Sequence, residues 1–150
     1  MTELLFYHLQ YQPLEKVLPA LLEKSLERGL RVVVQAASEE RVDALDAHLW
    51  TYRDDSFLPH GTAREGEAAA QPILLTTSDA NPNGAAVRFL IDGAPVPEDA
   101  ASYQRIVLLF DGEDEDALAT ARARWSEAKA KGFDVTYWRT DEQGRWVKQA

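Results

Sequence analysis

A predicted helix over residues 113–131 carries the side chains whose types and spacing best suit ligand binding. Its apolar stripe, at 100° per residue, consists of Leu118, Ala121, Trp125 and Ala128. Arg122 and Lys129 lie on the edge of this stripe, on either side of Trp125, whereas Arg124 and Lys131 are predicted to point away. Two cations around an aromatic ring suit a short acidic and hydrophobic peptide, because cations hold carboxylates and the ring packs apolar side chains. A tryptophan on an apolar stripe is also an ordinary core residue, so both interpretations stay open.

A second group of large side chains follows a predicted helix over 38–49. This segment contains Trp50, Tyr52, Phe57, Leu58 and Pro59, and it ends in His60. Aromatic residues are enriched in the buried centres of protein interfaces. The segment therefore either folds back onto the core or meets a protein partner.

The standard motifs of catalysis and nucleotide binding are missing. Gly61 and Gly66 have the spacing of a phosphate-binding loop, but Glu67 and Ala68 follow where Lys and Ser or Thr would be needed. The three histidines, which are His8, His48 and His60, have no ligand-spaced histidine neighbour, so surface or hydrogen-bonded imidazoles are expected. Acids at 113–116 are explained by the dipole of the helix that they begin. No metal site, no cofactor and no catalytic residue is expected.

Strands and helices alternate along the chain. Strands are predicted at 3–9, 32–34, 73–75, 88–91, 105–110 and 135–138, with a short tail segment at 145–147. Ser38 is a predicted N-cap, Gly29 and Gly132 are predicted helix ends, and 61–71 and 78–84 are predicted loops. Pro19 either lies in the first turn of a helix that begins near Val17 or kinks a longer helix.

This alternation predicts an α/β fold: a single three-layer α/β/α domain over 1–150, with a mostly parallel, Rossmann-like sheet. The chain has a 45% hydrophobic fraction, no cysteine and a net charge of −9 with a pI near 4.8. Disulfides and cysteine chemistry are thereby excluded. The acidic balance argues against direct nucleic-acid binding, which relies on clustered Lys and Arg. No signal peptide and no membrane span is expected, so a cytoplasmic location is predicted.

Several segments, in order, resemble the chi subunit of bacterial DNA polymerase III holoenzyme. They are FYHL near the start, KSLERGLRVVV, a helix ending in HLW, SFLPH, a late RIVLLFD, and a helix ending in KGFDVTYW. The resemblance runs through nearly the whole chain, and no single motif decides it. It implies a noncatalytic accessory subunit of the clamp loader that functions in DNA replication.

The resemblance also implies two partners. The psi subunit would bind at Trp50, Phe57, Pro59 and His60, and the acidic C-terminal tail of single-stranded-DNA-binding protein would bind at Arg122, Trp125 and Lys129. Leu118 stands where a further cation beside the tail pocket would be expected. The resemblance also leaves open a repair helicase as the partner at the psi-type surface. Two alternatives from the residues themselves are a nucleotide-binding α/β protein without a standard phosphate loop and direct binding of single-stranded DNA.

Overall fold

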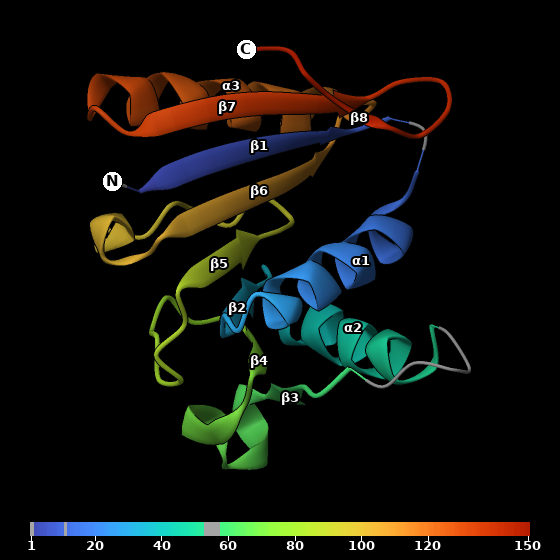
Figure 1. Cartoon of the computed structure of the whole chain (residues 1–150), viewed down its shortest axis with the longest axis vertical. Helices are drawn as coiled ribbons and strands as arrows, with labels where there is room; N and C mark the ends of the chain where they lie inside the picture. The colour runs from blue at the N-terminus through green and yellow to red at the C-terminus, as the bar shows by residue number, and fades with distance from the viewer. Residues whose placement is uncertain (1, 11, 53–57) are drawn as a thin grey trace.

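An eight-stranded sheet organises the part of the chain that the computed structural model describes, residues 2–10, 12–52 and 58–150 (Figure 1). The strands are β1 (Glu3–Leu9), β2 (Val32–Gln35), β3 (Gly61–Thr62), β4 (Ile73–Thr76), β5 (Val87–Leu90), β6 (Arg105–Asp111), β7 (Asp134–Thr140) and β8 (Trp146–Lys148). The helices are α1 (Leu14–Glu27), α2 (Glu39–Thr51) and α3 (Glu115–Ala130). Short 3₁₀ helices lie at Ala63–Glu65, Ala68–Ala70 and Ala100–Ser102.

The strand order is β3-β4-β2-β5-β6-β1-β7-β8, and every neighbouring pair is parallel except β7 and β8. Strand β1, the first in the chain, therefore lies between β6 and β7, two of the last three strands. The predicted α/β class and mostly parallel sheet are confirmed. The antiparallel strand β8, which overlaps the predicted tail segment, forms the edge of the sheet next to β7.

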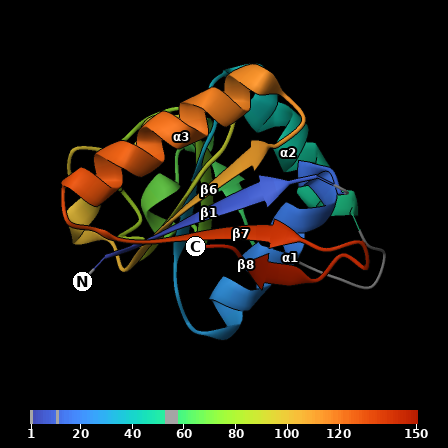
Figure 2. The same ribbon diagram turned by 90° about the horizontal axis from the view of Figure 1, so that it is seen from above.

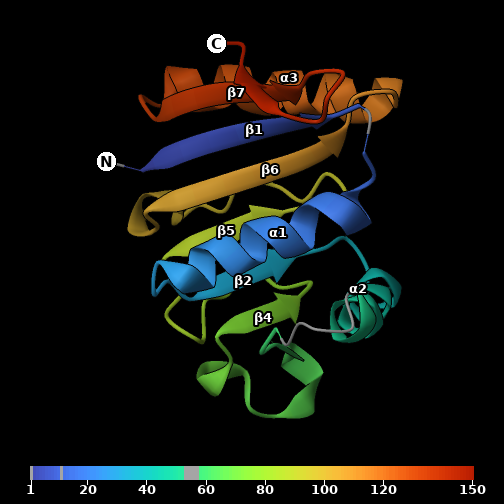
Figure 3. The same cartoon turned by 45° about the vertical axis from the view of Figure 1, so that its right-hand side comes forward.

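The helices cover opposite faces of the sheet. Helices α1 and α2 pack on one face, where Leu18, Leu22 and Leu45 join a core with alternate residues of the central strands. Helix α3 packs on the other face, over β6, β1 and β7 (Figure 2), where its Ala121 and Ala128 are buried. Figure 3 shows α1 lying across β5 and β2.

The predicted helix boundaries follow local chemistry. The Ser38 hydroxyl accepts a hydrogen bond from the Arg41 amide at 3.2 Å, which caps α2 as expected. The Asp114 carboxylate accepts bonds from the amides of Asp116 and Ala117 at 2.9 and 3.3 Å, so α3 begins after Asp114. Gly29 and Gly132 adopt φ values of 74° and 84° just beyond α1 and α3, a conformation that glycine takes without steric cost.

Pro19 lies inside α1, because the helix begins at Leu14. A proline has no amide hydrogen, so the carbonyl of Glu15 loses the helical hydrogen bond that residue 19 would donate. His48 of α2 supplies the replacement, with Nε2 at 2.6 Å from that carbonyl oxygen. The proline thus leaves open an acceptor through which α2 binds to α1, and His48 is a hydrogen-bonded imidazole as predicted.

The segment 61–71, predicted to be a loop, contains more structure than expected. Gly61 and Thr62 form β3 beside β4, and two 3₁₀ helices follow. A two-residue strand has no readable period, so its pairing could not be predicted. The Glu65 carboxylate accepts the Thr62 amide at 3.4 Å, which places a negative charge on the segment whose glycine spacing imitates a phosphate-binding loop.

Candidate functional site

Trp125 is seated between α3 and the sheet. Its ring contacts Phe6 of β1 edge-on, with ring centres 5.4 Å apart, and Tyr137 of β7 at 5.8 Å. The indole is partly buried, so its inner part belongs to the core while its outer part reaches the surface. The inner part of the indole therefore fits the interpretation as a core residue, and its exposed outer part fits the interpretation as a binding residue.

Two exposed cations accompany Trp125 on α3. The Lys129 ammonium lies 5.4 Å from the centre of the Trp125 ring, in a cation–π arrangement. Arg122 lies one turn earlier and is exposed. Throughout the described residues, neither cation forms an ion pair, although Arg41, Arg64 and Arg105 all do. Arg122, Trp125 and Lys129, here called the α3 surface, thus offer unneutralised positive charge on a chain with a net charge of −9.

Arg124 does not point simply away, as the helical spacing predicted. It lines a cavity between α3 and the ends of the strands. Its Nε is buried and has no hydrogen-bond partner among the described residues, while a terminal nitrogen lies 3.9 Å from Glu127. Because Arg124 lines this cavity, Arg122 and Lys129 are the cations that border Trp125.

Trp50 lies in the last turn of α2 rather than in a connecting segment. Half of its surface is exposed, and its ring centre lies 4.4 Å from that of His60. Leu58 is buried in the core, Pro59 is partly buried, and Phe57 lies outside the described residues. Leu58 after the helix therefore folds back onto the core, whereas Trp50 in the last turn of α2 leaves a large aromatic ring at the surface.

His60 is buried, and contacts with Leu58 and Asp46 fix its ring beneath Trp50. Its Nδ1 donates to the Leu58 carbonyl at 2.6 Å, and its Nε2 lies 3.1 Å from the Asp46 carboxylate. The imidazole thus lies under the Trp50 ring and below the surface. Trp50 and Pro59, here called the α2 surface, are the predicted psi-type residues that reach the surface in the described part of the chain.

A cavity of about 780 Å³ opens at the carboxyl ends of β1, β5 and β6, where sheets of this type commonly bind ligands. Its charged lining consists of Glu15, Asp92, Asp111, Glu113, Asp114 and Asp116, with Arg41 and Arg124. Arg41 is held by Glu15 at 3.0 Å and by Asp92 at 3.2 Å. Phosphate would meet excess negative charge here, which argues against the nucleotide-binding alternative.

The described residues contain no group of three or more His, Cys, Asp or Glu side chains placed to hold a metal ion. Within the same ranges, no helix is long and apolar enough to cross a membrane.

No pattern in the sequence indicated that Tyr137 or His8 lies next to the α3 surface. Phe6 pairs with Tyr137, and His8 with Arg139, in the parallel register of β1 and β7. These contacts depend on two strands from opposite ends of the chain being neighbours. The helical spacing around Trp125 contains no signal for them.

Comparison with known proteins gives a consistent result. Residues 1–136 match the model of a family described as DNA polymerase III chi subunit, HolC. The chain is 28% identical over 117 residues to the probable DNA polymerase III subunit chi of Rickettsia prowazekii, which covers 74% of this chain and 71% of that protein. It is 37% identical over 55 residues to the DNA polymerase III subunit chi of Pseudomonas aeruginosa, and that match covers 37% of each chain.

Proposed function

Because the chain belongs to the DNA polymerase III chi subunit family, we propose that it is a noncatalytic adaptor in the cytoplasm. In this role it joins the clamp loader, through the psi subunit, to the C-terminal tail of single-stranded-DNA-binding protein. The family makes it an accessory subunit in DNA replication. The two partners are those that the resemblance to this family implies, and the chemistry of the α3 and α2 surfaces supports them.

The observation that carries the proposal is the pair of unneutralised cations around Trp125. A short acidic tail with apolar residues has the complementary chemistry, since carboxylates pair with Arg122 and Lys129 while apolar groups pack on the indole. The overall negative charge of the chain would repel such a tail elsewhere. Binding is therefore expected to be modest in affinity and to weaken as salt is added.

The α2 surface lies at a distance from the α3 surface. Figure 1 shows α3 at one end of the sheet and α2 near the other. An exposed tryptophan supported by a buried ring is typical of the residues that anchor protein interfaces. Two separate surfaces allow both partners to bind at once, as an adaptor requires.

Replacing Arg122 with alanine is expected to weaken tail binding by about 1–3 kcal/mol, roughly 5- to 150-fold, because a charged hydrogen-bond partner is lost. The measurement is fluorescence anisotropy of a labelled peptide that matches the C-terminus of the cognate single-stranded-DNA-binding protein.

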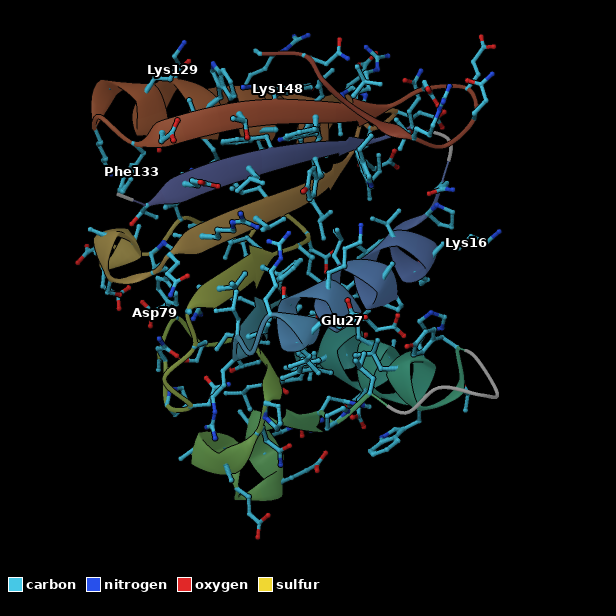
Figure 4. All side chains as sticks on the ribbon, in the orientation of Figure 1. Lys16, Glu27, Asp79, Lys129, Phe133 and Lys148 are labelled. Atoms are coloured by element: carbon cyan, nitrogen blue, oxygen red, sulfur yellow. The ribbon has the colours of Figure 1, made fainter. Side chains whose placement is uncertain are left out.

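Lys16→Ala is the matched control for Arg122→Ala, since it removes one exposed cation from α1, far from α3 (Figure 4). Its affinity should equal that of the wild type. An unchanged affinity in Arg122→Ala would place the site elsewhere, and no wild-type binding at low salt would refute the tail-binding proposal.

Replacing Trp50 with alanine is expected to weaken binding of the cognate psi subunit by about 2–3 kcal/mol, as for a central interface tryptophan. Tail binding should stay unchanged, because Trp50 is on α2 and the cations are on α3. Titration calorimetry with each partner measures both effects. If psi bound Trp50→Ala as tightly as the wild type, the α2 surface would not be the psi site; loss of both interactions would indicate misfolding.

A further inference from the structure

The α3 surface continues across the sheet toward the end of β7. Tyr137 contacts Trp125 on one side, and its hydroxyl lies 2.7 Å from Nδ1 of His8 on the other. His8 pairs with Arg139 in the register of β1 and β7, so the two side chains lie side by side on the face that α3 covers. An unbroken row of contacts thus runs from Lys129 through Trp125 and Tyr137 to His8, with Arg139 at its end.

Arg139 is held in place at this end of the row. Its Nε donates to the Gln10 side-chain oxygen at 2.7 Å, which leaves the two terminal nitrogens of the guanidinium for another acceptor. In the described part of the chain, Arg139 has no carboxylate partner. A fixed guanidinium with both terminal nitrogens left over suits a carboxylate, which accepts two parallel hydrogen bonds.

We propose that the acidic peptide is bound at a second position, where Arg139 and the Tyr137 hydroxyl hold one of its carboxylates beyond Arg122. This inference rests on the proposed function, because it extends the same peptide site. It names Arg139 and Tyr137 as further binding residues. Both lie just past the residues that match the family model.

His8 gives this second position a response to pH. The pKa of His8 lies below its ordinary value, because burial and the neighbouring Arg139 disfavour the imidazolium; Arg122 acts in the same direction, while Asp111 opposes them. Burial raises the pKa of Tyr137, and Arg139 and Arg122 partly offset that effect. Both guanidiniums therefore act on the same pair of side chains, so the second position adjoins the one at Arg122.

The hydrogen bond between His8 and Tyr137 reverses when His8 is protonated. With Nδ1 unprotonated, the Tyr137 hydroxyl donates to it; in the imidazolium, Nδ1–H donates and the tyrosine hydrogen becomes available to a carboxylate. The ring cannot move aside easily, because a methyl group added at Gly112 would lie 1.8 Å from Nε2. Since a bound carboxylate favours the imidazolium, peptide binding should raise the His8 pKa.

The same linkage fixes the sign of the pH effect. If the peptide raises the His8 pKa, then binding takes up protons, and affinity must increase as pH falls from 7.5 toward 5.5. The carboxylates of the peptide, with ordinary pKa values of about 4, stay ionised through this range. In the free protein the depressed His8 pKa has the opposite consequence, since stability is lost as pH falls below the ordinary histidine value.

The test compares Arg139→Gln with Arg145→Gln, which removes an equal charge from the turn after β7, where Arg145 pairs with Asp141 at 3.2 Å. Peptide affinity should fall about three- to tenfold in Arg139→Gln, as for a partly exposed charged contact, and less than twofold in Arg145→Gln. The peptide is then resynthesised with each Asp or Glu replaced in turn by its amide. One amide variant should bind wild type and Arg139→Gln equally, which identifies the carboxylate held at the second position.

The pKa of His8 can be measured by nuclear magnetic resonance of its ring. Peptide binding would not change this pKa if Arg139 and Tyr137 had only a structural role. The His8 pKa should rise when peptide binds the wild type, and should rise in free Arg139→Gln because a neighbouring cation is gone. Binding that is lost in Arg122→Ala but unchanged in Arg139→Gln would overturn the second position alone. No saturable binding by the wild type would overturn the proposed function and the second position together.

Discussion

Replacing Arg88 with methionine is expected to reduce the free energy of unfolding by about 3–5 kcal/mol, a large part of the stability of a single domain. Arg88 is the largest of the fully buried side chains in the described residues, with 0% exposure in the middle of β5. Methionine nearly preserves the volume of the side chain. The expected loss therefore comes from hydrogen bonds and not from a cavity.

The guanidinium of Arg88 is satisfied entirely by uncharged acceptors. It donates to the Gln35 side-chain oxygen at 2.7 and 3.1 Å, to the Ala80 carbonyl and the Tyr103 hydroxyl at 3.0 Å, and to the Ser78 carbonyl. Without these donors, several buried acceptors would lose their partners, at about 1–3 kcal/mol each before relaxation. The carbonyls of Ser78 and Ala80 belong to the loop at 78–84, so this loop would also lose two of its hydrogen bonds to the sheet.

Arg105→Met is the matched control, because Arg105 lies on the adjacent strand β6 and is 37% exposed, with Glu3 at 3.4 Å. An exposed ion pair contributes at most about 1 kcal/mol, so this variant should remain close to the wild type. Urea unfolding followed by tryptophan fluorescence measures both variants. A loss below 1 kcal/mol in Arg88→Met would show that the buried hydrogen bonds do not hold the loop.

Replacing Phe6 with alanine is the second change with a large expected effect, about 3–5 kcal/mol of stability. Phe6 is 0% exposed in the middle of β1, and its ring supports Trp125 from below. Its removal leaves a cavity under the indole. Trp125 would then lose its fixed orientation, so we expect the affinity for the acidic peptide to fall as well.

Phe89→Ala separates the local effect on Trp125 from general destabilisation. Phe89 is 2% exposed, and its ring belongs to the core on the opposite face of the sheet, under α1 and α2. Its loss should cost similar stability and leave peptide affinity unchanged. Both variants are compared by urea unfolding, and by peptide binding at a temperature where circular dichroism shows each to be folded. Equal affinities in the two variants would contradict a supporting role for Phe6.

The sequence by itself determined the long strands and helices and many of their ends. Val32 to Val34, the Ser38 cap and the glycines after α1 and α3 act within a few residues of the chain, so their effects can be predicted without the fold. The cations and the ring of the α3 surface could be grouped in the same way, because helical periodicity alone puts Arg122, Trp125 and Lys129 on neighbouring turns.

Strand order, by contrast, was decided by tertiary structure. β1 lies between β6 and β7, and the two-residue β3 joins the edge of the sheet, although its segment was predicted to be a loop. Pairings of this kind depend on long-range burial and register, which a local pattern does not contain. The position of His48 against Glu15 likewise required α1 and α2 to pack together before the acceptor left open by Pro19 could be used.

The extended peptide site shows the same division. His8 and Tyr137 are separated by 129 positions in sequence, yet they are hydrogen-bonded at 2.7 Å. Arg88 appears in the sequence as one cation in a short strand, and only the folded sheet makes it a buried donor. The sequence therefore determined which side chains share a helix face, because that follows from local geometry. Tertiary structure alone decided which strands bring distant side chains together, because that depends on packing of the whole core.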